Sequence, residues 1–272
     1  GALHNSSERY DPPKCHPGTR LALIEAIMAW IKDGQKTSFI MWLYGSAGAG
    51  KSAIAQTIAD MCYESGDLAA SFFWSRTDPT RNDEKCLIAT LASQLLVTIP
   101  EIRTHIEQAI RENHLLLSLS LEAQMESLIV KPLERAFGGQ ADHKRVKLIV
   151  LDGLDECGNP NAERQILQVI SKAVRKFPIR LVFLITSRQE QGISDTFNSD
   201  RLLPIASRFA LDATCKPDDD IRHYLVEEFD SLKRSHVFGR YLPSIWPTTE
   251  QIEELVQKSS GQFIYASIVA KF

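Results

Sequence analysis

The residues best suited to chemistry form one short segment, Gly45-Ser46-Ala47-Gly48-Ala49-Gly50-Lys51-Ser52, which fits the pattern G-x-x-x-x-G-K-[ST] at every fixed position. Small residues allow the backbone to curl until successive N–H groups converge on an anion. Lys51 adds a mobile positive charge, and the helix expected to follow presents its positive N-terminus to the same anion. We therefore predict a phosphate-binding loop in which Ser52 coordinates Mg²⁺.

A second group of candidates follows an apolar run, where Leu148–Leu151 leads into Asp152. A carboxylate at the C-terminal edge of a parallel sheet faces the crevice where ligands bind, so Asp152 is expected to hold Mg²⁺, usually through water. Asp155 and Glu156 lie just beyond it, and one of them could orient or polarise an attacking water. Asp155 is the first choice and Glu156 the alternative, and a solvated helix start is the other interpretation of the pair.

A third strand end supplies arginines. Leu181–Ile185 leads into Thr186-Ser187-Arg188, which in a parallel sheet points to the same edge as Asp152. The planar guanidinium of Arg188 suits the oxygens of a γ-phosphate, and an ordinary surface arginine is the alternative. Arg76 and Arg81 follow another apolar run and are expected in a solvated loop.

The elements that must position these residues alternate along the chain. Short apolar runs predict strands at 39–44, 69–74, 147–152, 179–186 and 204–211. Helical spacing is found after Thr19, the expected N-cap, then at 52–64, at 83–137 with breaks near residues 100 and 117–120, and at 165–177. Continuous apolar strands separated by helices indicate an α/β fold with a five-stranded parallel sheet covered on both faces.

The pattern changes after Lys216-Pro217, where three further helices are expected at 218–233, 248–258 and 261–272 without another strand. Three regions follow from this change: an N-terminal lead-in over 1–18, a nucleotide-binding domain over 19–212 and a small helical subdomain over 213–272. The three acids at 218–220 suit the first turn of a helix.

Composition narrows the class of protein. A net charge of −3 over 272 residues gives no sign of a nucleic-acid surface, which carries excess Lys and Arg. The five cysteines are widely spaced without a C-x-x-C pair, so neither a zinc site nor a disulfide framework is expected. His105 and His114 are expected to be structural. The apolar runs are too short for a membrane span and the N-terminus does not read as a signal peptide, so we expect a cytoplasmic protein.

The phosphate loop combined with Asp152-Gly153-Leu154-Asp155-Glu156 and Thr186-Ser187-Arg188 resembles the NACHT family, signal-transducing NTPases of the STAND group related to animal inflammasome receptors. Three further segments look more narrowly like fungal NACHT proteins, including those of heterokaryon incompatibility. They are Cys15-His16-Pro17-Gly18-Thr19-Arg20, Ser71-Phe72-Phe73-Trp74-Ser75-Arg76 and Leu151–Cys157. The resemblance runs from about residue 10 to the end of the chain.

The resemblance implies an ATP/ADP switch of an innate-immunity receptor. In such proteins ADP holds a closed resting state, ATP permits homo-oligomerisation, and slow Mg²⁺-dependent hydrolysis resets the switch. Carried over by motif, Gly45–Ser52 is the Walker A loop, Asp152 the Walker B acid and Arg188 a sensor arginine, while Thr19 and Arg20 flank the adenine. The chain departs from many relatives in having Gly261-Gln262-Phe263-Ile264 in place of a Gly-x-Pro, and it ends before a winged-helix domain. The implied partners are the other domains of a longer receptor.

Two other functions stay open. A P-loop small-molecule kinase needs an acceptor pocket, which the helical stretch 83–137 could hold, although the acids at 152–156 favour water activation. A module that binds nucleotide without turnover is the second alternative. A Ras-type GTPase is disfavoured because the sequence has no Asn-Lys-x-Asp segment.

Overall fold

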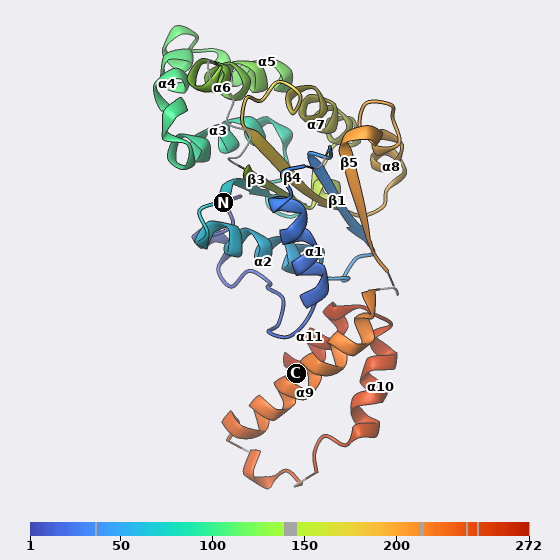
Figure 1. The fold of residues 1–272 in the computed structure, drawn as a ribbon. Helices are drawn as coiled ribbons and strands as arrows, with labels where there is room; N and C mark the ends of the chain where they lie inside the picture. The colour runs from blue at the N-terminus through green and yellow to red at the C-terminus, as the bar shows by residue number, and fades with distance from the viewer. Residues whose placement is uncertain (36, 139–145, 213–214, 238, 244, 272) are drawn as a thin grey trace.

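A computed structural model of the chain describes residues 1–35, 37–138, 146–212, 215–237, 239–243 and 245–271. Its centre is one five-stranded parallel sheet in the order β2-β3-β4-β1-β5 (Figure 1). The strands are β1 (Ile40–Gly45), β2 (Leu68–Phe73), β3 (Val146–Asp152), β4 (Arg180–Ser187) and β5 (Ala206–Leu211). The predicted α/β fold with a five-stranded parallel sheet is confirmed, and each strand lies within two residues of its expected bounds.

The strand order brings the predicted chemistry to one edge of the sheet. β4 lies between β1 and β3, with Leu43 opposite Thr186 and Leu151 opposite Ile185. β4 is buried along its whole length and β2 likewise, which explains why these strands read as continuous apolar runs. Because all five strands are parallel, the phosphate loop, the acidic turn and Arg188 emerge on the same side.

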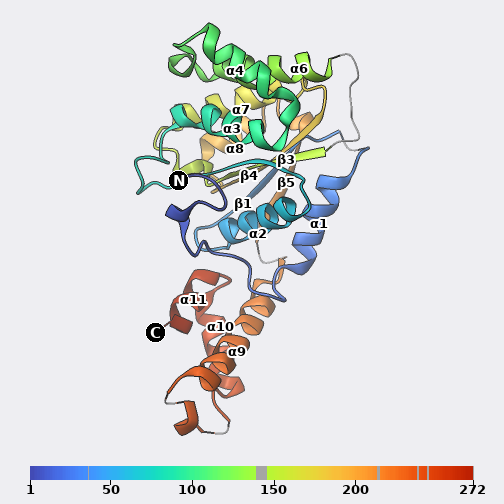
Figure 2. The same ribbon diagram turned by 90° about the vertical axis from the view of Figure 1, so that its left-hand side faces the viewer.

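Helices cover both faces of the sheet (Figure 2). One face carries α1 (Leu21–Lys32) and α2 (Lys51–Glu64), which share an apolar cluster with β1, β3 and β4. On the other face lie α3 (Leu87–Thr98), α7 (Pro160–Ala173) and α8 (Gln191–Phe197), and a further layer outside them is formed by α4 (Arg103–Glu112), α5 (Leu121–Met125) and α6 (Lys131–Phe137). A π-helical turn over Glu126–Val130 joins α5 to α6.

Three helices extend beyond the side of the sheet that α1 and α2 cover, seen in orange and red in Figure 1. They are α9 (Pro217–Ser235), α10 (Thr249–Ser259) and α11 (Phe263–Lys271). They enclose their own apolar cluster, formed by Ile221, Leu225, Phe229, Ile252, Val256 and Ala266. The expected domain boundary at residue 213 and the last residue, 272, lie outside the described residues, and the division of the chain into domains stays a prediction.

The N-terminal segment packs against the sheet. The backbone N–H of Phe73 donates to Ala2 O at 2.9 Å, and the N–H of His4 donates to Ser71 Oγ at 2.9 Å. The side chains of Ala2 and His4 are buried. Since β2 is an edge strand, the segment shields an edge that would otherwise be open to pairing.

The prediction that Thr19 caps the N-terminus of α1 was wrong. Arg20, with φ of 56°, is the residue before the first turn, and its side chain makes no capping hydrogen bond. Thr19 instead donates its hydroxyl to His16 O at 2.7 Å, and its N–H donates to the same oxygen. The hydroxyl therefore closes the preceding turn and not the helix.

Among the described residues, no single helix is both long and apolar enough to cross a bilayer. The segments Glu84–Thr98 and Pro100–Glu112 are long and apolar enough only when they are taken together, and the chain bends by 113° between them.

Candidate nucleotide-binding site

The phosphate loop connects β1 to α2 through backbone conformations that glycine adopts most easily. Gly48 and Gly50 have φ of 77° and 95°, in the left-handed region where a side chain causes strain. Gly45 passes so close to β5 that an added Cβ would lie 3.0 Å from Leu211. The loop therefore curls tightly enough to present its N–H groups, together with the N-terminus of the 14-residue helix α2, to one anion.

Lys51 lies folded over this loop. Its Nζ donates to Gly45 O at 2.9 Å and to Ser46 O at 2.8 Å. Burial lowers the pKa of Lys51, while the nearby carboxylates of Asp155 and Asp152 raise it. The ammonium is thus held where a phosphate would accept its hydrogen bonds in place of two neutral carbonyl oxygens.

Asp152 is buried at the end of β3 and fixed by its neighbours. Its Oδ1 accepts a hydrogen bond from Thr186 Oγ1 at 2.6 Å, and Thr186 Oγ1 in turn accepts from Gly153 N at 2.9 Å. Burial raises the pKa of Asp152, and hydrogen bonds from Thr186 and Ser52 oppose that shift. The structure therefore brings the predicted pair, Ser52 and Asp152, together as one hydroxyl and one carboxylate, both oxygen donors of the kind Mg²⁺ prefers.

Asp155 has both carboxylate oxygens engaged by one residue. The N–H of Arg188 donates to Oδ1 at 2.9 Å, and Nε of Arg188 lies 3.2 Å from Oδ2. Asp155 is 4% exposed, whereas the side chain of Arg188 is about half exposed. Gly153, with φ of 76°, allows the tight turn that directs Asp155 toward β4. In this conformation Asp155 links the ends of β3 and β4.

Glu156 is the less restrained acid of the turn. Its Oε2 accepts a hydrogen bond from Arg76 N at 3.1 Å, close to the surface. The guanidinium of Arg76, which was expected in a solvated loop, is exposed but donates to Asp155 O at 2.9 Å. The loop after β2 therefore supports the acidic turn from the side opposite Arg188.

Arg20 and Thr19 are the two predicted adenine contacts, and each has a different set of neighbours in the structure. Arg20 is buried, donates from Nη2 to Ala49 O at 3.3 Å, and has its Nε 3.6 Å from Asp220 on α9. Its guanidinium carbon also lies 4.9 Å from the ring centre of Phe263. Nε and Nη1 make no hydrogen bond. Arg20 therefore joins the phosphate loop to the C-terminal helices, while Thr19 is occupied by its own turn.

A cleft of about 900 Å³ opens between the phosphate loop and the C-terminal helices. Its volume lies within the range typical of small-molecule sites. Its walls include Arg20, Gly45, Ser46 and Ala49 on one side, and Lys216–Asp219, Val256, Gln257, Ser260 and Gly261 on the other. Ile264 N donates to Gly48 O at 3.4 Å, so α11 touches the loop directly.

The family described as Nephrocystin 3, N-terminal, matches residues 19–188. This span exceeds half of the chain and contains the phosphate loop, Asp152, the acidic turn and Arg188. The chain belongs to the Nephrocystin 3 N-terminal family. With its complete phosphate loop and its sheet, it is a P-loop NTPase nucleotide-binding module of NACHT type, as the motifs predicted.

Solved structures resemble the Nephrocystin 3 N-terminal chain only distantly. Caenorhabditis elegans PCH-2 aligns over 92% of this chain and 61% of its own length, with 13% identity and a TM-score of 0.44. AMPPCP-bound DnaA from Aquifex aeolicus aligns over 95% and 61%, with 14% identity and a TM-score of 0.44. The Drosophila ORC structure with GC-rich DNA and Cdc6 aligns over 88% and 38%, with 12% identity and a TM-score of 0.46. This chain thus spans about three fifths of PCH-2 and DnaA. No curated protein matches it.

Arg9 of this Nephrocystin 3 N-terminal chain lies near the site, although its sequence context did not predict this position. The guanidinium carbon of Arg9 lies 3.6 Å from the ring centre of Phe73, and Nη1 donates to Gln56 Oε1 at 2.8 Å. Phe73 is opposite Asp152 in the sheet. Burial lowers the pKa of Arg9 to about 10, and the charge of Asp152 opposes that shift. A lone arginine in a polar lead-in carries no pattern that predicts such a position.

Proposed function

We propose that this chain is the ATP/ADP-binding switch module of a longer signal-transduction protein, of the kind found in fungal NOD-like receptors, with slow Mg²⁺-dependent hydrolysis of ATP. The observation that supports this best is the contact between α11 and the phosphate loop, through Ile264 N and Gly48 O. Because the two walls of one cleft belong to the sheet and to the C-terminal helices, a ligand that enters the cleft acts on their relative position. The immune role and the cytoplasmic location rest on the resemblance to fungal NACHT proteins.

The residues present fit a nucleotide and its metal ion. A Cβ on Gly48 would lie 2.5 Å from Ile264, so glycine at this position allows α11 to pack against the phosphate loop. Lys51 supplies the charge, and the positive guanidinium of Arg20 lines the cleft. Ser52 and Asp152 would hold Mg²⁺, which when bound neutralises charge on the phosphate oxygens.

The protein groups divide the remaining work. Lys51 exchanges its two carbonyl acceptors for phosphate oxygens when nucleotide binds. Glu156 is the acid that is free to orient a water, because Arg188 already engages both oxygens of Asp155. Release of that pair would let the guanidinium of Arg188 turn toward the γ-phosphate. In this proposal the ion pair between Asp155 and Arg188 opens before hydrolysis.

The same ion pair favours one second candidate, a module that binds nucleotide without turnover. If the link between Asp155 and Arg188 stays closed when ATP is bound, neither residue reaches the phosphate. The module would then respond to which nucleotide is present and would not convert one into the other. Turnover decides between the two functions.

Chromatography of nucleotide released from denatured, purified protein is the first test, followed by phosphate release with added MgATP. We expect retained ADP and slow turnover. Lys51→Ala removes two charge-assisted hydrogen bonds, about 3 kcal/mol or roughly a hundredfold in affinity. A titration with fluorescent ATP measures this loss, and Lys85→Ala, at an exposed position in the 3-10 turn before α3, is the matched control. Equal ATP affinity for wild type and Lys51→Ala would refute the assignment. Measurable affinity without phosphate release would select the second candidate.

A further inference from the structure

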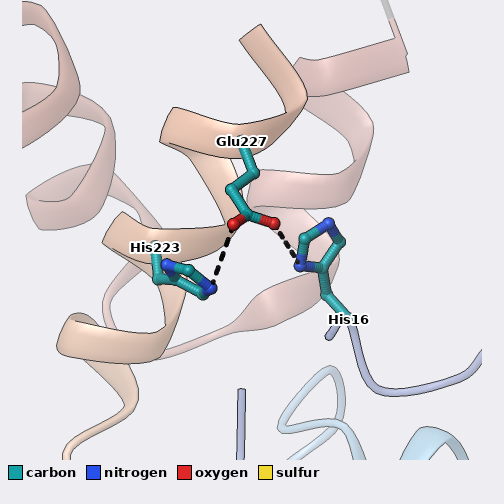
Figure 3. Close-up of side chains that lie close together, drawn as sticks. All are labelled: His16, His223 and Glu227. Carbon is teal, nitrogen blue, oxygen red and sulfur yellow. Dashed lines mark ion pairs between the residues drawn. The ribbon is translucent and has the colours of Figure 1, made fainter. Parts of the chain in front are cut away.

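We propose that the chain carries a zinc site between the segment before α1 and helix α9, formed by His16, His223 and Glu227. Figure 3 shows the three side chains directed toward one another, with Glu227 between the two imidazoles. One donor atom from each residue lies within 4.8 Å of the other two. The residues come from opposite parts of the chain, so the site forms only in the folded protein.

The three donors lie near one another but farther apart than the ligands of a bound ion. His16 Nδ1 lies 3.7 Å from Glu227 Oε2, and His223 Nε2 lies 3.6 Å from Glu227 Oε1. Ligands about 2.0 to 2.1 Å from Zn²⁺ in a tetrahedron are roughly 3.3 Å apart. These two separations end on different oxygens of Glu227, and the three donor atoms of one set lie within 4.8 Å of one another, so an ion would draw them together by up to about 1.5 Å. Because His223 and Glu227 are about half exposed, their side chains have room for the rotations that this requires.

The donor set selects the metal. Two imidazole nitrogens and one carboxylate suit Zn²⁺ and other late divalent metals, whereas Mg²⁺ and Ca²⁺ prefer oxygen donors. His223 and Glu227 are four residues apart on α9, which places both on one face of the helix. A tetrahedral ion would take its fourth ligand from water.

A second carboxylate lies where metal-binding histidines usually have one. The other ring nitrogen of His16, Nε2, lies 3.7 Å from Glu228 Oε1. A ligand histidine commonly donates its second N–H to a carboxylate, which fixes the ring and makes it a better ligand. Tyr224 packs edge-on against the same ring, with 5.2 Å between ring centres. Tyr224 and Glu228 thus lie against the ring of His16, and Nδ1, which donates to Pro17 O at 3.0 Å, would exchange that hydrogen bond for the ion.

Gly18 permits the close approach of the two elements. Its φ is +81°, and an added Cβ would lie 2.3 Å from His223 Nε2. Any other residue at this position would push the imidazole away from the cluster. The absence of a side chain at residue 18 therefore makes space for the donor atom of His223.

A bound ion would join two walls of the nucleotide cleft at a second point. His16 lies four residues before Arg20 in the sequence, and Arg20 already contacts Asp220 of α9. None of the three proposed ligands lines the cleft. The proposal therefore does not depend on the proposed function, and a variant that cannot bind nucleotide should still bind zinc.

The test is calorimetric titration of chelator-treated protein with Zn²⁺ at pH 7.5, supported by the absorption spectrum of the Co²⁺ form. We expect one tight site per chain. His16→Gln, His223→Gln and Glu227→Gln should each lower affinity more than tenfold, and Glu228→Gln about tenfold. His114→Gln removes an exposed histidine elsewhere and should leave affinity unchanged. Circular dichroism verifies that each variant is folded.

Gly18→Ala provides an independent test because it deletes no ligand. It should also weaken Zn²⁺ binding more than tenfold through displacement of His223. Lys51→Ala should bind Zn²⁺ like wild type, which separates this site from the nucleotide site. The proposal is overturned if wild type binds no Zn²⁺, if His223→Gln binds it equally well, or if His114→Gln loses as much affinity.

Discussion

The link between Asp155 and Arg188 yields a graded prediction for the stability of the protein. Asp155→Asn keeps an oxygen acceptor for the N–H of Arg188 but loses the ion pair. The partner side chain is about half exposed, and exposed pairs contribute less than about 1 kcal/mol. Asp155→Ala also leaves that N–H without its 2.9 Å acceptor, which brings the expected cost to about 2 kcal/mol. The alanine variant should therefore be clearly less stable than the asparagine variant.

Urea unfolding at pH 7.5, followed by circular dichroism, measures both steps. Glu156→Ala is the matched control, since this acid belongs to the same turn and has one surface hydrogen bond to Arg76 N. We expect it to change the free energy of unfolding by less than about 0.5 kcal/mol. If Asp155→Asn and Asp155→Ala lose the same free energy, or neither loses any, Asp155 does not hold the end of β4 and the reasoning fails.

Two further predictions concern other parts of the site. Burial raises the pKa of Glu163 to about 7 from a usual value of 4.5, so the folded state takes up a proton in this window and stability falls as pH rises through it. Glu163→Gln should therefore raise the urea midpoint relative to wild type at pH 8 more than at pH 4.5; an equal change at both would contradict this. Gly48→Ala should cost about 1 to 2 kcal/mol for its φ of 77°, plus the clash with Ile264. Ile264→Ala should recover only the clash in a double-mutant cycle of unfolding free energies, and strictly additive effects would refute the contact.

The sheet and the phosphate loop were predictable because their signals are local. The apolar runs of β1 to β4 indicate buried strands, and the glycine spacing indicates a backbone that must turn sharply. The acids at 152–156 could be assigned to the same edge as Arg188 because parallel strands end together. That argument places residues near one another but does not pair them. The occupation of both Asp155 oxygens by Arg188 depends on β4 lying beside β3, which spacing along the chain does not reveal.

Tertiary packing decided the features that were missed. The helix α8 has a glycine at its second position and weak helical preference, yet it forms because Phe197 stacks on Trp42 of β1, with 4.3 Å between ring centres. The start of α7 is an exception, because Asn159 caps the helix ahead of Pro160, five residues before the predicted start, and this signal is local. Arg9 reaches the site through the fold of the N-terminal segment, which no periodic pattern marks.

The end of β4 has a further consequence for insertions and deletions. Three successive residues face different partners there: Thr186 bonds to Asp152, Ser187 accepts from Trp42 Nε1 at 2.8 Å, and Arg188 bonds to Asp155. Because neighbouring side chains of a strand point to opposite faces, a shift of one residue would exchange all of these partners at once. The number of residues in β4, which lies between the phosphate loop and the acidic turn, is therefore constrained. Substitutions within it can be conservative, but a change in its number of residues would move Thr186 and Arg188 out of register with Asp152 and Asp155.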